Sequence, residues 1–184
     1  MNGLFVAAEQ IQDLCRQERW EFCFIGGLAV LRWGEPRVTR DVDLTLLAGF
    51  GEEEVFVDRL TARFDARVED IAQFALRTRV VLLRTAEGVP IDVALGALPF
   101  EERSVQRASD WVVIGSEPLR TCSPEDLVVH KAFAGRDRDW ADLAGIIARS
   151  GDRLDRELIS TELAPLLELK GDQDSLNRLF GLLG

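Results

Sequence analysis

The sequence predicts an α+β fold, with a mixed sheet and helices over residues 1–120 and a short helical region over residues 121–184 that packs on them. Two observations carry this prediction. In the first part, short apolar or alternating runs typical of strands are interleaved with segments of helical periodicity. In the second part, apolar residues recur at helical spacing alone. With 184 residues, 47% hydrophobic and 29% charged, the chain suits one globular domain, or one domain with a modest appendage.

The first 64 residues predict two helix–strand units followed by a helix. Apolar residues lie at helical intervals over residues 4–19, and the aromatic run 20–25 is typical of a buried strand. Gly26-Gly27 ends that strand, and residues 28–33 predict a short helix that Gly34 closes. A loop over 35–39 leads to a second strand over 41–47. Acidic residues after Gly51 then suit the start of an amphipathic helix over 55–64.

The middle of the chain predicts a hairpin, a helix and a further strand. The runs 74–84 and 89–95 are interpreted as adjacent strands joined at Glu87-Gly88. Residues 99–107 predict a helix and residues 111–114 a strand. Ser123 then precedes Pro124 and two acidic residues, the pattern of a capped helix start. From there to residue 183 the sequence predicts helices, broken at Gly135, Gly151 and Gly171.

Composition argues against several classes of function. The net charge of −10 opposes binding to long duplex DNA or to an anionic membrane surface. No apolar run approaches the roughly 20 residues that cross a bilayer, and the start of the chain lacks the basic region of a signal peptide. Cys15, Cys23 and Cys122 are scattered and form no CxxC pair, as expected of reduced thiols. We therefore expect a cytoplasmic protein.

Asp41-Val42-Asp43 is the first candidate for chemistry. Residues two apart on a strand point to the same face, so both carboxylates would enter one space, where they repel each other. A hard divalent cation relieves that repulsion, because Mg²⁺ (or Mn²⁺) takes carboxylates together with substrate phosphate oxygens as ligands. The alternative is an edge strand whose acidic side chains face solvent.

Two neighbouring features strengthen the metal interpretation. Gly26-Gly27 directly precedes a predicted helix, whose N-terminal N–H groups are suited to phosphate; the alternative is a turn that needs positive φ. Asp92 lies in an otherwise apolar strand, where burial is costly unless a metal or an arginine pairs with it. Three carboxylates opposite a glycine-lined helix start predict a two-metal phosphoryl-transfer site, with Asp41, Asp43 and Asp92 as catalytic residues and metal ligands.

The segment FIGGLAVLRWGEPRVTRDVDLTLL, residues 24–47, resembles the core of the nucleotidyltransferase superfamily related to DNA polymerase β. Its Gly-Gly…Arg-x-Thr-x-Asp-x-Asp form is similar to AbiEii-type toxin nucleotidyltransferases and their uncharacterised bacterial relatives. A second stretch, from Lys131 to Asp142, is similar to the helical signature of the same toxins. The resemblance is close over residues 20–47 and 121–148 and moderate over 76–96. It implies a polymerase β-like core that transfers a nucleoside monophosphate from an NTP.

The resemblance also implies roles for further residues. Lys131 would contact the NTP phosphates. Arg37, Thr39 and Arg40 lie just before the acidic pair and would meet triphosphate oxygens or brace the loop. Many of these transferases carry Gly-Ser where this chain has Gly26-Gly27, so one hydroxyl donor to phosphate is missing. Asp139 and Asp142 share a helix face and would pair with arginines and orient the lysine; the alternative is ordinary surface charge. The predicted nucleotide-binding residues are Gly26, Gly27, Thr39, Arg40 and Lys131, with Arg136, Arg138, Asp139 and Asp142 in support.

Three functions follow from these residues. The leading one is a Mg²⁺-dependent transferase that moves an NMP to an RNA end or a protein hydroxyl. It would act as a toxin of a toxin–antitoxin or phage-defence system, and an antitoxin protein is then a candidate partner. The second is the same chemistry on a small molecule, as in aminoglycoside- and lincosamide-modifying enzymes, supported by the paired glycines and the acidic charge. The third is a degenerate module that binds nucleotide or a partner without turnover.

Overall fold

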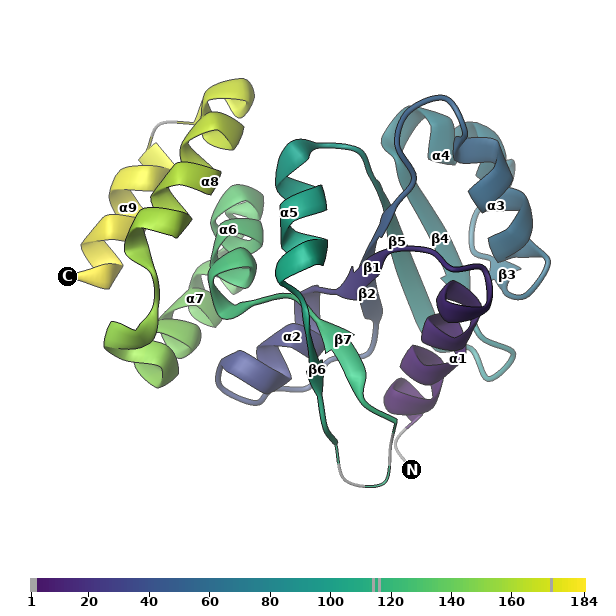
Figure 1. Cartoon of the computed structure of the whole chain (residues 1–184), viewed down its shortest axis with the longest axis horizontal. Coiled ribbons are helices and arrows are strands. Elements are labelled where there is room, and N and C mark those ends of the chain that lie inside the picture. Colours follow the sequence, from purple (N-terminus) through teal and green to yellow (C-terminus); the bar gives the residue numbers. More distant parts are fainter. Residues whose placement is uncertain (1–2, 114, 116, 173) are drawn as a thin grey trace.

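A mixed β-sheet runs through the centre of the molecule, with helices on both faces (Figure 1). The computed structural model describes residues 3–113, 115, 117–172 and 174–184. Within these residues the sheet has seven strands in the order β3-β4-β5-β2-β1-β7-β6. The strands are β1 (Phe22–Phe24), β2 (Val42–Leu47), β3 (Asp65–Ala66), β4 (Val80–Arg84), β5 (Pro90–Gly96), β6 (Ser109–Trp111) and β7 (Leu119–Thr121).

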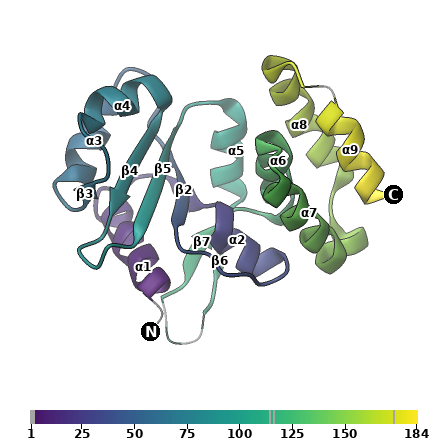
Figure 2. The same ribbon diagram turned by 180° about the vertical axis from the view of Figure 1, so that it is seen from behind.

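Helices α3 and α4 lie at one end of the molecule and α6 to α9 at the other, with α1, α2 and α5 between them (Figure 2). In chain order the helices are α1 (Gly3–Gln17), α2 (Gly26–Trp33), α3 (Glu53–Thr61), α4 (Ile71–Thr78), α5 (Pro99–Arg107), α6 (Pro124–Ala134), α7 (Asp137–Ser150), the 3-10 turn η1 (Gly151–Arg153), α8 (Arg156–Lys170) and α9 (Asp174–Leu183). None of the helices in the described residues is long and apolar enough to cross a membrane.

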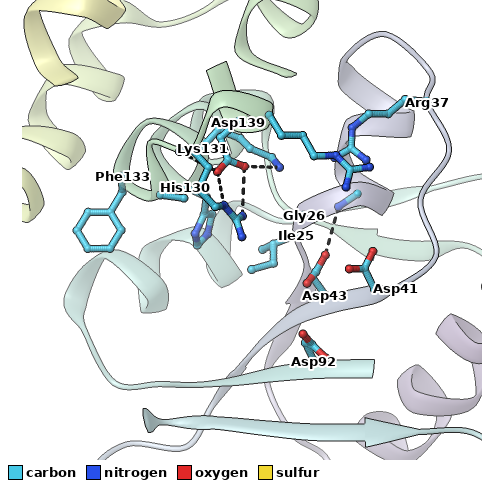
Figure 3. A pocket seen from close by; sticks show the side chains of 14 residues that line it. Ile25, Gly26, Arg37, Asp41, Asp43, Asp92, His130, Lys131, Phe133 and Asp139 are labelled. Carbon is cyan, nitrogen blue, oxygen red and sulfur yellow. Dashed lines mark hydrogen bonds and ion pairs between the residues drawn. The ribbon is translucent and has the colours of Figure 1, made fainter. Parts of the chain in front are cut away.

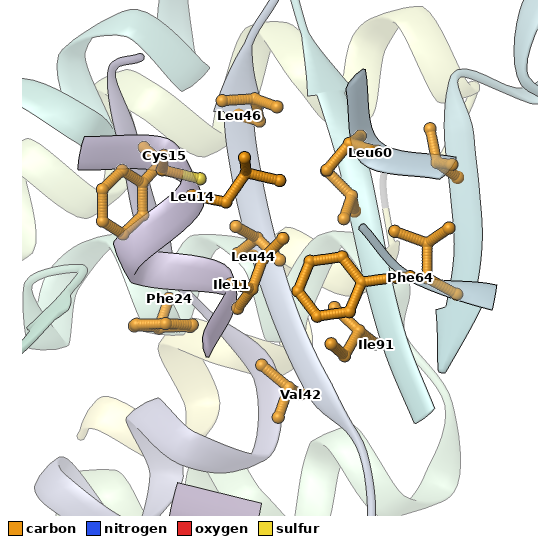
Figure 4. Close-up of a cluster of buried hydrophobic side chains, with 14 of the residues drawn as sticks. Ile11, Leu14, Cys15, Phe24, Val42, Leu44, Leu46, Leu60, Phe64 and Ile91 are labelled. Atoms are coloured by element: carbon orange, nitrogen blue, oxygen red, sulfur yellow. The ribbon is translucent and has the colours of Figure 1, made fainter. Parts of the chain in front are cut away.

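The alternation of β2 divides its side chains between two cores. Val42, Leu44 and Leu46 are fully buried on one face, against α1 and the neighbouring strands (Figure 4). The opposite face is covered by a second core that α2 and α5 share with the helices from α6 to α9. Asp43 lies on the strand between Val42 and Leu44, so its side chain points away from the first core. The alternation therefore places the polar residues Asp43 and Thr45 on the face opposite Val42, Leu44 and Leu46.

The central strands place two carboxylates side by side. Strand β2 pairs with β5 in parallel, in a register that sets Asp43 opposite Asp92. Equivalent positions on paired strands point to the same face of a sheet. Strand β1, antiparallel to β2 on its other side, leads directly into α2 and thereby brings Gly26 and Gly27 to the same end of the sheet.

The strand predicted over residues 74–84 is wrong in its first half, because the chain forms helix α4 over Ile71–Thr78 and only Val80–Arg84 is a strand. The Asp70 carboxylate caps the helix by accepting from the Gln73 N–H. Arg79 ends it in the left-handed region at φ 57°, and its side chain donates to Glu53 at 2.5 Å and to the Leu95 carbonyl at 2.9 Å. The Asp70 cap is local, whereas the Arg79 contacts come from distant segments, and together they support a helix where the apolar run predicts a strand.

The other predicted elements are found, with shifted ends. The strand predicted over 111–114 instead spans Ser109–Trp111, and residue 114 lies outside the described residues. Strands β3 and β7 were not predicted, because two or three residues show no periodicity. Helix α6 starts as predicted: the Ser123 hydroxyl accepts from the Asp126 N–H at 3.0 Å, and Gly135 ends the helix at φ 68°. Helix α6 packs against α2 of the first part of the chain. The division of the chain into two regions at residue 120 stays a prediction.

Candidate active site

A cavity of about 440 Å³ opens where the start of α2, the start of β2 and the α6–α7 turn meet (Figure 3). Its size falls within the range of small-molecule sites, roughly 300–1,000 Å³. Carboxylates from the sheet form one wall, and cationic side chains from the helices and the loop after α2 form the other. The lining residues are Ile25, Gly26, Gly27, Arg37, Asp41, Asp43, Asp92, His130, Lys131, Phe133, Ala134, Arg136, Arg138 and Asp139.

Asp41 and Asp43 both enter this cavity, as the strand spacing predicts. Burial, and then the negative charge of Asp41, raise the pKa of Asp43 to about 6, although the Gly27 N–H donates to Asp43 at 3.4 Å. The cavity therefore holds two carboxylates whose joint ionisation is disfavoured. A divalent cation between them would remove that cost, so this donor set fits Mg²⁺ or Mn²⁺.

Asp92 reaches the cavity but is already paired. Arg67, just after β3, donates to the Asp92 carboxylate at 2.6 Å. Burial raises the pKa of Asp92, and Arg67 only partly offsets that effect. Among the described residues, no three His, Cys, Asp or Glu side chains form a group that could hold a metal ion. The structure thus brings the three predicted carboxylates to one cavity and pairs the third with an arginine, the alternative that its buried position had left open. A metal-binding or catalytic role for Asp92 stays a prediction.

The two glycines pack against the residues that line this cavity. Gly26 has φ 56°, and a Cβ there would lie within 2.7 Å of the Asp43 Cβ. A Cβ on Gly27 would lie 2.7 Å from the Thr39 Cβ, closer than real Cβ contacts come. The positive φ of Gly26 agrees with the alternative interpretation, in which the glycine is required by the turn between the strand and the helix. Both glycines are also needed because the start of α2 lies directly against Asp43 and Thr39, where it lines the cavity.

Lys131 is buried between two aspartates of α7. Its ammonium group lies 3.0 Å from Asp139 Oδ1 and 2.8 Å from Asp142 Oδ2. Each aspartate has an arginine as well: Arg136 Nε donates to Asp139 at 2.6 Å, and Arg37 donates to both Asp142 oxygens at 2.5 and 2.8 Å. Burial alone would raise the pKa of Asp139 and of Asp142, but these hydrogen bonds and charges lower both.

The predicted network is therefore observed with one change of partner. Arg138 contacts neither aspartate and instead donates to the Val38 carbonyl at 3.1 Å. Arg37 takes its place on Asp142, across 105 positions of sequence. Sequence reasoning noticed Arg37 but could not pair it with a helix so far along the chain.

Thr39 and Arg40 lie beside the cavity rather than in its lining. The Thr39 hydroxyl donates to Asp41 Oδ1 at 3.0 Å. Arg40 is exposed and lines a neighbouring depression together with Val38, Asp41 and Arg138. Direct contact of Thr39 and Arg40 with a nucleotide stays a prediction.

The less polar residues of the cavity lining are Ile25, His130, Phe133 and Ala134. Burial lowers the pKa of His130 to about 4, and its ring packs edge-on against Phe100 at 5.0 Å. No hydrogen-bond partner for its Nε2 is found among the described residues. His130 is therefore packed into the wall of the cavity.

Comparison with known proteins agrees with this geometry. The family model described as "Nucleotidyl transferase AbiEii toxin, Type IV TA system" matches residues 12–180. No curated protein matches the chain in sequence. Among solved structures, an antigenic nucleotidyltransferase-like protein from Paracoccidioides brasiliensis is 18% identical, with a TM-score of 0.51 over 92% of this chain and 89% of that one.

The antibiotic-resistance factor ANT(2'')-Ia is similar in two structures. Its solution structure is 15% identical, with a TM-score of 0.58 over 91% of this chain and 92% of that one. Its crystal structure with adenylyl-2''-tobramycin is 14% identical, with a TM-score of 0.55 over 88% and 95%. At these identities the likeness concerns the fold, and it confirms the predicted α+β architecture with a polymerase β-like core.

Proposed function

The chain belongs to the AbiEii nucleotidyltransferase family, and from this premise we propose that it transfers a nucleoside monophosphate from an NTP to an acceptor hydroxyl. The observation that carries the proposal is the meeting of Asp41 and Asp43 with the glycine start of α2 in one cavity. Phosphoryl transfer needs little beyond positioning and charge stabilisation, and this cavity offers both.

The cationic wall suits a triphosphate. Arg37, Lys131 and Arg136 line the cavity opposite the aspartates, and the helix start adds backbone N–H groups. Arg136 is the most exposed of the three side chains, so it could exchange its ion pair with Asp139 for a phosphate, whereas Lys131 is buried between Asp139 and Asp142. Lys131 would therefore act on the triphosphate mainly through its fixed charge at the cavity wall.

The aspartates would hold the divalent metal that this family usually uses. Mg²⁺ or Mn²⁺ on Asp41 and Asp43 would neutralise the triphosphate and activate the acceptor hydroxyl. A full two-metal site also requires Asp92, which would have to exchange Arg67 for the second ion. The Arg67–Asp92 pair is partly exposed, at 29% and 32% of the two side chains, so its rearrangement is not opposed by deep burial.

For the acceptor, we propose an RNA end or a protein hydroxyl, in keeping with a toxin role. Arg40 lines a neighbouring depression that shares Asp41 and Arg138 with the cavity, so two arginines lie beside the site although the chain carries a net charge of −10. Positive charge beside the site favours a phosphate-bearing acceptor. The second candidate, an aminoglycoside acceptor, is favoured by the acidic charge of the whole chain and by the fold shared with ANT(2'')-Ia.

The test is to incubate the purified chain with each of four labelled NTPs and Mg²⁺, together with total RNA, cell protein or an aminoglycoside. Label on RNA or protein supports the leading proposal, and label on the antibiotic supports the second. Asp43→Asn should abolish labelling, whereas Asp58→Asn, an exposed aspartate on α3, should not. A wild type that binds NTP and labels nothing would be the degenerate module.

A further inference from the structure

Thr39 fills the space into which a side chain at position 27 would project. A Cβ built on Gly27 would lie 2.7 Å from the Thr39 Cβ and 3.2 Å from its Cγ2, with the hydroxyl closer still. A threonine on the loop after α2 thus occupies the place of a side chain on the first turn of the helix. The glycine at 27 and the threonine at 39 are spatially complementary.

The Thr39 hydroxyl also binds one of the two cavity carboxylates. It lies 3.0 Å from Asp41 Oδ1, and in the described part of the chain no other hydrogen bond reaches that carboxylate. Asp43 is held differently, by the Gly27 N–H. Each carboxylate is therefore oriented by a group at or against residue 27. Because Asp41 is exposed, its orientation depends more on this hydrogen bond than on packing.

Helix α7 holds the loop that carries Thr39. Arg37 makes its paired hydrogen bonds to Asp142, which is only 3% exposed, and Arg138 donates to the Val38 carbonyl. The backbone of Gly145 lies so close to Glu35 that a Cβ there would come within 3.1 Å of the Glu35 nitrogen. The loop is thus tied to α7 at three successive points before it reaches Thr39.

We propose that Thr39 is a positioning residue, whose hydroxyl acts from the space that a side chain at position 27 would fill. This hydroxyl orients the Asp41 carboxylate for the metal-bound nucleotide. Helix α7 fixes the position of Thr39 by holding the loop that carries it. The inference rests on the proposed function, in which Asp41 is a metal ligand.

The first experiment separates the hydroxyl from the shape of the side chain. Thr39→Val keeps the shape and removes the hydroxyl, whereas Thr39→Ser keeps the hydroxyl. Mn²⁺ binding is measured by electron paramagnetic resonance without nucleotide, and NMP transfer and the melting temperature are measured beside it. We expect Thr39→Val to weaken Mn²⁺ binding and transfer by about tenfold, the scale of one hydrogen bond to a charged group. Thr39→Ser should stay within threefold of the wild type, and both variants should melt like it.

The second experiment moves the hydroxyl to the helix. Gly27→Ser alone should impair Mn²⁺ binding, because its side chain meets Thr39. The double variant Gly27→Ser/Thr39→Gly removes that obstacle and should bind Mn²⁺ more tightly than Thr39→Gly alone. A Thr39→Val variant equal to the wild type, or a double variant no better than Thr39→Gly, would overturn the inference. A wild type that binds Mn²⁺ but transfers to no acceptor would count against the proposed function only, and the Mn²⁺ affinities would still decide the role of Thr39.

Discussion

Replacing Lys131 by methionine tests how the cationic wall of the cavity is held. The change keeps an unbranched apolar side chain and removes only the ammonium group. That group lies 3.0 Å from Asp139 and 2.8 Å from Asp142, and the three side chains are 8%, 2% and 3% exposed. Lys131→Met therefore leaves two buried carboxylates without their shared cation.

The expected loss of stability follows from this burial. Removing one partner of a buried ion pair costs about 3–5 kcal/mol, because the other charge stays buried without compensation. Here each aspartate keeps one arginine, Asp139 keeping Arg136 and Asp142 keeping Arg37, which places the loss near the lower limit. We expect the free energy of unfolding to fall by about 3 kcal/mol.

Urea unfolding of the wild type and two variants measures this loss. Lys170 is the only other lysine, and its ion pair with Asp172 is more exposed, so Lys170→Met is a matched control with a smaller expected effect. NTP affinity is measured on the folded fraction at low urea. If Lys131→Met unfolds no more easily than Lys170→Met, the ammonium group is not a structural cation, and the reasoning from burial is refuted.

Three further predictions concern the cavity. Asp41→Asn should abolish metal-dependent NTP binding and transfer with an unchanged melting temperature, since Asp41 is exposed; retained turnover would contradict its role as a ligand. Asp92→Asn should keep NTP affinity within several-fold but lower transfer by about 10²-fold, and should cost little stability because the pair with Arg67 is partly exposed; equal transfer would leave Asp92 a structural partner. The pKa of His130 is lowered to about 4, so the unfolded chain, with a histidine pKa of about 6.5, takes up the proton first as pH falls. Wild-type stability should then be fully present above pH 6.5 and decline toward pH 4; in urea unfolding between pH 7 and 5, the wild type should lose roughly 2 kcal/mol more than His130→Phe, and parallel curves would reject this.

Local patterns in the sequence were sufficient for most elements and for the centre of the site. The Ser123 cap, the helix over Pro99–Arg107 and the alternation of Val42–Leu47 depend on neighbours within a few residues, and the structure confirms all three. The convergence of Asp41 and Asp43 follows from strand spacing for the same reason. Residues that lie close together in the sequence and enter one cavity can therefore be predicted from their spacing.

Tertiary structure alone decided which arginines pair with Asp92 and Asp142. Arg67 meets Asp92 across 25 positions, and Arg37 meets Asp142 across 105, so neither pair leaves a trace in local periodicity. The same holds for helix α4, which long-range contacts of Arg79 stabilise against an apolar run that predicts a strand. An ion pair forms where folding brings opposite charges together at hydrogen-bond distance, and that meeting depends on the path of the whole chain.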